Sequence, residues 1–486
     1  MVNLSKIFSF ILAFLALSLS FAQISFYKTY TGGLYDVGQG VCELPDSSYA
    51  ITGSTSSLSE TTSKTLLMVV DSLGNHLWTK GYGGNESDWG RRIFHRENQG
   101  FWIMGYSNSY GDGSFDFTIW RINDQGELLW VKNLENSAWS RLWDAIELPN
   151  GDFILAGEIE GDETLAKDIL LYRITEEGDE VWEKHIENSG DDIAYAVALY
   201  DDTTLLVAGE YFENEQRNGI ILNIHTADGS INNHWIYDED GEASFRDIAI
   251  FVEDIYIAGA FFPDSIDNKK SIQLKIDVDF NIESDNFTSW SGDLYFSNVA
   301  VKTGNAIYWV MHTESPDHNV FPGGKDALLL RYNNALQWAG VSLPLTGYDP
   351  DEVHQIIPTQ DGGLLLVGLC SDDRTQSSQG RDVMLYKIGP NDEFTGDATV
   401  GNDLVNIYEE ETSVLKVFPN PFSEDIKIET NENITSMEVY DLLGKRIPIT
   451  VKESTIINFS KSLPKGTYFL KINLANSYQV RKVIKE

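Results

Sequence analysis

Cysteine is almost absent from this 486-residue chain, in which only Cys42 and Cys370 occur. A framework of several disulfides is therefore excluded, and the fold must depend on a packed core. The two cysteines fall in the first and last copies of a repeat described below. They are either one bridge across the seam of the fold or two small buried side chains.

Positive charge is also scarce, with 35 Lys and Arg against 74 Asp and Glu and a net charge of −39. Residues 414–486 hold 11 of the basic residues and 8 of the acidic ones, so the acidic excess lies in the preceding part of the chain. Such a surface repels the phosphates of nucleic acids and anionic lipid headgroups. We therefore expect no nucleic-acid partner.

Long apolar runs are missing except at the start, where Ile7–Leu19 follows Lys6. This run is too short to cross a membrane comfortably, and Ser20-Phe21-Ala22 after it is typical of a signal-peptidase site. The pattern predicts a signal peptide over residues 1–22 and no transmembrane segment elsewhere.

The chain has a repeat, most clearly seen at Asp88–Leu134, where four short apolar runs alternate with turn residues. The residues that end the second run of each copy are Gly53, Gly105, Gly157, Gly209, Gly259, Met311 and Gly368, at steps of 52, 52, 52, 50, 52 and 57 residues. Seven four-stranded units of this length are typical of a β-propeller. We therefore predict an all-β fold with a seven-bladed propeller over residues 23–395.

The seventh copy lacks a fourth run, and the missing strand is predicted to come from the other end of the chain. Residues 24–33, ISFYKTYTGG, resemble the fourth run of copy one at Leu77–Gly84, LWTKGYGG. Residues 24–31 are thus expected to complete the last blade and remove an exposed edge. An acidic linker is expected at residues 396–413.

A glycine turn followed by tryptophan joins the third and fourth runs, as in NDQGELLW at Asn123–Trp130. Glycine supplies the positive φ of a tight hairpin, and the tryptophan is expected to pack between blades. Aspartates recur before the first run, as at Asp36, Asp88 and Asp192, and at the start of the third, as at Asp116, Asp168 and Asp382. In register with the fold, they are interpreted as turn caps rather than as a ring of ligands.

Two stretches of the sequence resemble known families. The pieces Trp78–Gly84, Asp361-Gly362-Gly363-Leu364 and Asp168–Arg173 resemble repeat arrays common in secreted bacterial proteins. After residue 414, FPNPF, VYDLLGKRI, LPKGTYFLKI and RKVIKE follow in the order found in the type A C-terminal sorting domain of the type IX secretion system. The second resemblance implies a small β-sandwich over residues 414–486, export across an outer membrane, and the secretion machinery as partner.

The candidate ligand site is a set of aromatics at the connections that enter each first strand. These residues are Trp89, Trp139, Tyr195, Phe245, Tyr295 and Tyr348, with Tyr35 in the first copy. On one face of a propeller they would gather as an aromatic crown suited to sugars or peptide side chains. The alternative is that each packs between adjacent blades.

No catalytic motif or cofactor site is evident, and no catalytic residue, metal or cofactor is predicted. His312, Glu314, Asp317 and His318 share one loop, which we interpret as solvated rather than metal-binding. Arg91, Arg92, Arg141 and Arg246 lie near first strands, so a site with three converging arginines, as in sialidases, stays open. The sequence favours a secreted or surface binding or adhesion propeller for a glycan or protein. The alternative is a glycan-active hydrolase or lyase, with a quinone-dependent dehydrogenase further behind.

Overall fold

The computed structural model describes residues 25–391 and 416–485 with short gaps. The gaps are 60–61, 137, 161–165, 189, 238–240, 264–269, 289–293, 303–305, 314–325, 346–351, 371–380, 419–421, 424, 430–433, 442–444, 453–454, 460–462 and 475–477. The chain divides into two compact units, Met1–Ile407 and Tyr408–Glu486. The predicted signal peptide and acidic linker lie outside the described residues.

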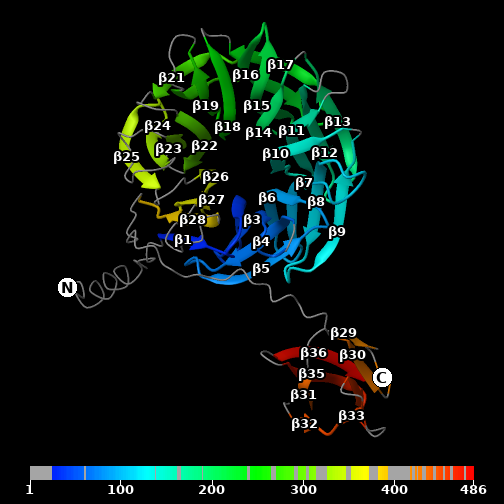
Figure 1. Cartoon of the computed structure of the whole chain (residues 1–486). Coiled ribbons are helices and arrows are strands. Elements are labelled where there is room, and N and C mark those ends of the chain that lie inside the picture. The colour runs from blue at the N-terminus through cyan, green and yellow to red at the C-terminus, as the bar shows by residue number, and fades with distance from the viewer. Residues whose placement is uncertain are drawn as a thin grey trace, which may run out of the picture. The chain divides into compact units, whose positions relative to one another are not determined.

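Seven four-stranded antiparallel sheets make up the first unit and are arranged in a ring (Figure 1). The first strand of each sheet is closest to the centre of the ring. These inner strands are β2 (Asp36–Glu43), β6 (Asp88–Arg96), β10 (Ser140–Glu147), β14 (Ile193–Asp201), β18 (Glu242–Phe251), β22 (Leu294–Lys302) and β26 (Glu352–Pro358). This architecture confirms the predicted seven-bladed propeller.

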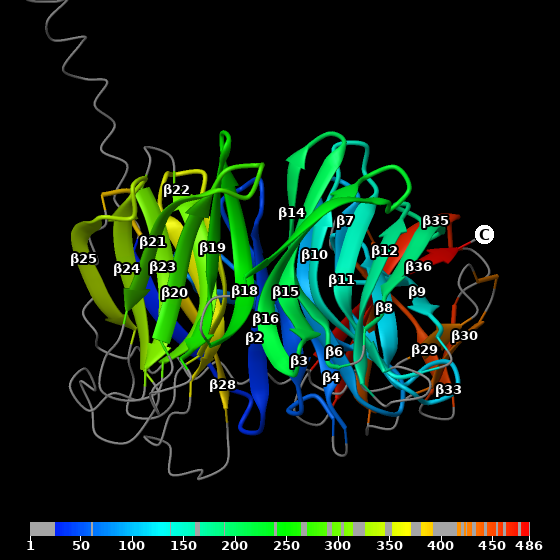
Figure 2. The ribbon, with the colours of Figure 1, turned by 90° about the horizontal axis from the view of Figure 1, so that it is seen from above.

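The other strands follow outward in chain order. The second strands are β3 (Tyr49–Thr55), β7 (Gly100–Ser107), β11 (Phe153–Glu160), β15 (Thr204–Glu213), β19 (Asp254–Phe262), β23 (Ala306–Thr313) and β27 (Leu364–Cys370). The third strands are β4 (Lys64–Val70), β8 (Asp116–Ile122), β12 (Lys167–Ile174), β16 (Gln216–His225), β20 (Lys270–Ile276), β24 (Asp326–Asn333) and β28 (Asp382–Ile388). The outer strands are β5 (His76–Tyr82), β9 (Leu128–Leu134), β13 (Glu180–Ile186), β17 (Ile231–Tyr237), β21 (Ile282–Thr288), β25 (Trp338–Leu345) and β1 (Phe26–Tyr30). In a view turned by 90°, the strands of neighbouring sheets run side by side through the thickness of the ring (Figure 2).

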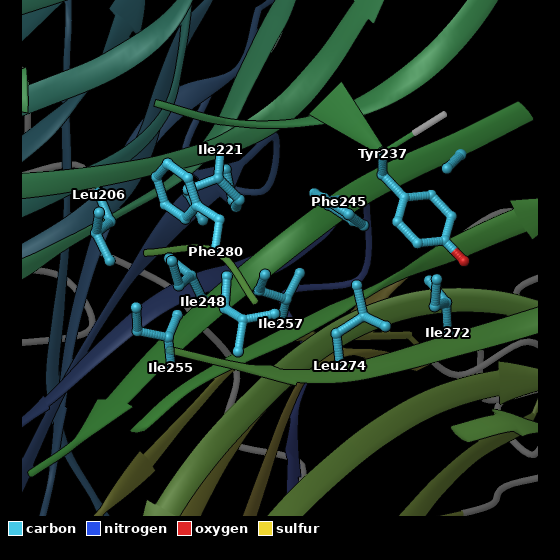
Figure 3. Packing of buried hydrophobic residues seen from close by; sticks show 14 of the residues in the cluster. Leu206, Ile221, Tyr237, Phe245, Ile248, Ile255, Ile257, Ile272, Leu274 and Phe280 are labelled. Atoms are coloured by element: carbon cyan, nitrogen blue, oxygen red, sulfur yellow. The ribbon is translucent and has the colours of Figure 1, made fainter. Parts of the chain in front are cut away.

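The core of the propeller lies between the sheets rather than at its centre. Seven buried clusters each combine side chains from two neighbouring blades. In the cluster between blades four and five, Leu206 and Ile221 of one sheet meet Ile257 and Leu274 of the next (Figure 3). Because both faces of every sheet are covered, the second and third strands are apolar on both faces instead of alternating.

The ring closes through β1, which pairs antiparallel with β28 and so becomes the outer strand of the seventh sheet. The contacts of β1 repeat those of β5, 52 residues later in the chain. The Tyr30 hydroxyl donates to the Gly74 carbonyl at 2.7 Å, and the Tyr82 hydroxyl donates to the Gly126 carbonyl at 2.8 Å. Each of these outer strands therefore binds the glycine hairpin of the following blade, and β1 does so for blade one.

The hairpin tryptophans of blades one to three pack between blades, as the repeat predicts, whereas Trp338 of blade six is 59% exposed. A Cβ placed on Gly178 would lie 3.2 Å from the Trp130 ring, and one on Gly229 would lie 2.9 Å from Trp182. Both glycines have φ in the left-handed region, +79° and +70°. The Trp182 indole N–H also donates to the Thr226 carbonyl at 3.0 Å, so this tryptophan is fixed by the next blade.

The recurrent aspartates cap chain segments. Asp88 is fully buried and accepts from the hydroxyls of Ser107 and Ser109 at 2.5 and 2.9 Å. Asp36 accepts in the same way from Thr55 and Ser57 at 2.5 and 2.7 Å. These contacts join the first and second strands of one blade and support the structural interpretation of the aspartates.

The two cysteines lie in separate interfaces between blades and are not bonded to each other. Cys42 packs against the cluster between blades one and two, whereas Cys370 belongs to the cluster between blades six and seven. The two thiols therefore face away from their shared seam, and no disulfide bridges it. Burial raises the pKa of the Cys42 thiol to about 12, so the thiol stays protonated at physiological pH.

The second unit is a β-sandwich of two four-stranded sheets, β29-β30-β34-β33 and β32-β31-β35-β36. Its strands are β29 (Lys416–Phe418), β30 (Asp425–Glu429), β31 (Ile434–Asp441), β32 (Arg446–Ile447), β33 (Thr450–Lys452), β34 (Ile456–Asn458), β35 (Gly466–Leu474) and β36 (Tyr478–Lys485). Phe422 of the FPNPF motif is buried with its ring centroid 4.4 Å from that of Phe459, and its N–H donates to Ile484. The sequence motifs of this unit thus meet in its core.

Candidate ligand site at the propeller axis

One residue of every inner strand is bulged out of its pairing with the second strand. The seven bulged residues are Gln39, Arg91, Trp143, Tyr195, Arg246, Ser297 and His354. A bulge adds a residue to one strand and redirects the chain locally. Because the inner strands surround the centre of the ring, these seven positions form a ring around the axis.

Five side chains join into a continuous axial cluster, which we define as Arg91, Arg141, Trp143, Tyr195 and Arg246. The guanidinium carbons of Arg91 and Arg141 lie 4.3 and 4.2 Å from the Trp143 ring centroid. Trp143 meets Tyr195 edge to face at 5.1 Å, and the Arg246 guanidinium lies 3.8 Å from the Tyr195 ring. Four consecutive blades, from two to five, thus contribute to one cationic and aromatic surface.

Arg91 is held firmly within the axial cluster although it is almost fully buried. Its Nε donates to the Leu142 carbonyl at 3.2 Å and its Nη1 to Gln39 Oε1 at 2.5 Å. Burial lowers its pKa to about 10, and the charges of Arg141 and Arg92 also act to lower it. The guanidinium is still charged at neutral pH. Its Nη2, like the Nε of Arg141, is buried without a hydrogen-bond partner among the described residues.

Two buried carboxylates border the axial cluster from the second strands. Glu210 accepts from Arg246 Nη2 at 2.8 Å and also lies 3.6 Å from Arg217. Glu158 has no exposed surface and is 3.2 Å from Lys167 Nζ. Glu158 is also the cross-strand partner of Arg141, and its charge acts to raise the pKa of Arg91. Neither Arg91 nor Arg141 forms a close ion pair with a carboxylate in the described part of the cluster.

A second layer of polar contacts ties neighbouring inner strands together. Asp144 accepts from Arg92 Nε at 2.6 Å and from the Val197 N–H at 2.9 Å. Asp247 accepts from the Val299 N–H at 2.9 Å. Burial, together with the nearby charge of Asp144, raises the pKa of Asp247 to about 7. Arg92, Asp144 and Asp247 each come directly after a bulged residue, so their contacts support the ring of bulged residues from the adjacent position of the strand.

The predicted aromatic crown is spread over different positions of the strand. Trp89 is half-buried and stacks on Tyr106 at 6.1 Å, with an interplanar angle of 7°. Tyr35 lies 6.5 Å from Trp89, and Trp139 is half-buried just before β10. Tyr195 is the one predicted residue that is itself a bulged member of the axial cluster. Trp89 adjoins that cluster indirectly, since Arg141 lies over the same Tyr106 ring at 5.3 Å.

Phe245 corrects part of that prediction because it is fully buried. It pairs with Gly259 and packs against Trp235 between blades four and five. It also packs against Tyr237, which lies beside it in Figure 3. Phe245 occupies the last position before the bulge, where the side chain faces the neighbouring sheet instead of a ligand. The side chain of Tyr295 and all of Tyr348 lie outside the described residues.

The histidine considered as a metal ligand also has a structural contact. His312 is buried in β23, and its Nε2 accepts from the Val353 N–H at 2.9 Å, which joins blades six and seven. Glu314, Asp317 and His318 lie outside the described residues. Within the described residues, no group of three or more His, Cys, Asp or Glu could hold a metal ion.

The sequence carries a signal for the axial residues that the aromatic pattern does not. Gln39, Arg91, Trp143 and Tyr195 are spaced by 52 residues, and three of them follow a capping aspartate by three positions. Aligning the copies on these aspartates and on the 52-residue step would have placed Arg91 and Trp143 at the same point of the fold. Of the four arginines considered, the structure brings Arg91, Arg141 and Arg246 together, whereas Arg92 turns to Asp144.

Comparison with known proteins defines the class of this molecule. The first unit is a seven-bladed propeller, and the second matches the secretion system C-terminal sorting domain over residues 416–486. The chain is therefore a type IX secretion substrate, exported to the cell surface or the extracellular space through its C-terminal domain. Among the described residues, no helix is long and apolar enough to span a membrane.

Solved structures resemble the propeller at low sequence identity. The propeller domain of the Trilobed protease from Pyrococcus furiosus has 10% identity and a TM-score of 0.42, over 76% of this chain and 94% of its own. A polysaccharide lyase of family PL25, an ulvan lyase, has 11% identity and a TM-score of 0.47, over 76% and 95%. Sqt1 from Chaetomium thermophilum has 11% identity and a TM-score of 0.42, over 75% and 98%. No curated protein sequence matches this chain.

Proposed function

We propose that the propeller is a binding or adhesion module that acts outside the cell and takes its ligand at the axial cluster. The observation that carries the proposal is the ring of bulged residues. Seven blades share one backbone bulge, yet the residue type at the bulge varies from blade to blade. A ring that served only packing could repeat one residue, as the hairpin tryptophans do, whereas recognition needs varied groups at fixed positions.

The favoured ligand is a glycan, with a protein as the alternative. Trp143 and Tyr195 supply half-buried aromatic surface, and Arg141 and Arg246 supply partly exposed donors beside it. Trp89 and Trp139, at the start of inner strands in the same part of the ring, extend the candidate surface. Export to the cell surface or beyond brings the protein to where extracellular polymers are found.

A glycan-active enzyme remains the second candidate because of Glu158. This carboxylate is completely buried, and its ion-pair partner among the described residues is Lys167, whose Nζ lies 3.2 Å from it. Burial raises the pKa of nearby Tyr195, so its hydroxyl stays protonated at neutral pH and can donate a hydrogen bond to a bound sugar. Two titratable groups beside several arginines are the minimum for proton transfer on a bound sugar.

The test is a glycan-array screen of the secreted protein, followed by a chain-cleavage assay on every glycan that binds. Trp143→Ala should abolish binding, whereas Trp130→Ala, which removes a half-buried tryptophan from outer strand β9, should leave it intact. Binding without cleavage supports the binding module, and cleavage that is lost in Glu158→Gln supports the enzyme. Ligand binding that survives Trp143→Ala in a folded variant would overturn the axial site.

A further inference from the structure

We infer that the axial cluster recognises an oxyanion group, a carboxylate or a sulfate ester, on an acidic glycan. This inference rests on the proposed binding function and names its ligand class. Three guanidinium groups, from blades two, three and five, meet around Trp143 and Tyr195. A guanidinium presents planar N–H donors that match the geometry of carboxylate and sulfate oxygens.

The first argument is that donors in the axial cluster lack acceptors. Arg91 is 8% exposed, and its Nη2 has no partner among the described residues, as is true of the buried Nε of Arg141. A buried donor without an acceptor costs free energy, so such groups in native proteins call for an explanation. An oxyanion bound beside Trp143 would supply the missing acceptors.

The second argument comes from the other arginines of the propeller. Arg92, Arg96 and Arg173 are each paired with a carboxylate, at 2.6, 2.8 and 2.6 Å. Arg91 and Arg141 have no such pair in the described part of the chain, although acidic residues outnumber basic ones about twofold. Arg121 also lacks a carboxylate partner, but it donates to three backbone carbonyls. Glu158, whose charge reaches Arg91, is paired with Lys167, so an external anion would complete Arg91 and Arg141.

The third argument concerns the aromatic faces. The guanidinium groups of Arg91 and Arg141 both lie over Trp143, and that of Arg246 lies over Tyr195. Stacking on rings fixes the direction of a guanidinium and lowers the conformational entropy lost when it binds an anion. The same stacking covers aromatic surface that a neutral sugar would need. The cluster is therefore better suited to a charged substituent than to an uncharged ring.

The acidic surface makes the experiment specific. A protein with a net charge of −39 repels polyanions, and this repulsion is screened beyond about 8 Å at physiological ionic strength. Non-specific binding of an acidic polysaccharide is thus not expected, and any binding reports a local site. We would titrate the full-length secreted protein with oligogalacturonate, dextran sulfate and neutral dextran by calorimetry.

We expect oligogalacturonate or dextran sulfate to bind and neutral dextran not to bind. The polysaccharide that binds shows whether the recognised group is a carboxylate or a sulfate ester. Arg141→Gln and Arg246→Gln should each weaken it by about tenfold to a hundredfold, since each removes a charge-assisted hydrogen bond. The matched control is Arg96→Gln, at the far end of β6. It removes the same charge from an arginine that also lies over aromatic rings, Trp102 and Phe153, and should leave affinity unchanged.

Other outcomes separate this inference from the proposed function. Binding of dextran that is unaffected by Arg141→Gln but lost in Trp143→Ala would overturn the oxyanion site and keep the glycan-binding propeller. Failure of all three polysaccharides, together with an empty glycan array, would overturn both. Equal weakening by Arg96→Gln would show that net charge, and not the axial cluster, governs binding.

Discussion

The outer hairpins and the axial ring are two zones of the same repeat that differ in how much their residue types vary between blades. At the hairpins, blades one to three each place the same pair in contact, a tryptophan against the glycine turn of the next blade. At the axis, successive blades share only the backbone bulge and carry glutamine, arginine, tryptophan, tyrosine, arginine, serine and histidine there.

This contrast separates the interactions that hold the ring together from those that are available to bind a ligand. The hairpin contact recurs with one geometry in blades one to three, so one residue type satisfies it there. The bulge relieves that constraint, because its residue is outside the ladder of the sheet. Stability is therefore expected to depend on the hairpins and binding on the axis.

Removing β1, which supplies the hairpin contact at the seam, should have the most severe result. Deleting residues 24–31 exposes the edge of β28 and removes buried Phe26 and Tyr30, a loss of about 3–6 kcal/mol from these two side chains alone. Thermal unfolding should shift down or lose its cooperativity. A synthetic peptide of residues 24–31 should restore it by strand addition. An unchanged melting temperature after the deletion would show that the ring is closed by other contacts.

The next prediction sets a hairpin tryptophan against the axial one. Trp182 is 8% exposed and fixed by Thr226, so Trp182→Ala should lower the free energy of unfolding by about 3–5 kcal/mol. Trp143 is half-buried, and Trp143→Ala should cost only about 1–2 kcal/mol. Urea titrations of both variants measure the two losses. Equal losses would mean that Trp143 is part of the scaffold and would erase the distinction between the zones.

A third prediction uses Asp247, which supports the axial ring and is faced by Asp144 and Arg92. Its pKa is about 7 in the folded protein and near 4 when unfolded, so the folded state holds the proton more tightly between these values. Asp247 therefore lowers stability as pH rises from about 4 to 7. Asp247→Asn does not titrate, so its stability relative to the native protein should increase over this range. We expect an increase of about 1–2 kcal/mol, which is less than the pKa difference alone would give, because solvent reaches part of the carboxyl. Urea midpoints at pH 5 and 8 test this, and a pH-independent difference would contradict it.

The mildest change tests the equivalence of β1 and β5. Tyr30→Phe and Tyr82→Phe each remove one hydroxyl that donates to a hairpin glycine carbonyl. Each should cost about 1 kcal/mol, and the two losses should agree, because the contacts are the same one blade apart. Denaturant midpoints provide the comparison. A much larger loss for Tyr30→Phe would show that the seam is more dependent on this bond than an ordinary interface.

The fold could be predicted from the sequence because its determinants recur at fixed spacing. The hairpin tryptophans and the glycines at about 52-residue intervals indicate the blades, and the likeness of residues 24–33 to Leu77–Gly84 indicates the closing strand. The blade signals are local and are repeated several times. The sorting domain could be predicted from the sequence equally well, because its motifs form one small core around Phe422.

The site was harder to predict because one residue more or less in a strand reverses the side chain's direction. Trp89, Tyr195 and Phe245 look alike as aromatics near the start of inner strands. In the structure, Phe245 is at the paired position directly before the bulge, where it faces the preceding blade. Tyr195 is in the bulge itself, one position later, and Trp89 is one position earlier than the paired position. The bulged residues share no residue type, so their only signal in the sequence is their spacing and the aspartates that precede some of them.

The order of β1 and β28 along the chain determines when the ring can close. The closing pair joins residues 26–30 to residues 383–387, so a contact of very large sequence separation completes the last sheet of the propeller. Closing so long a loop is a slow step compared with forming any single hairpin. Until β28 has been synthesised, the first strand has no partner and the growing sheets end in an open edge. A chain that ends before β28 would therefore keep an unpaired strand edge permanently. This edge would distinguish an incompletely synthesised chain from a complete one.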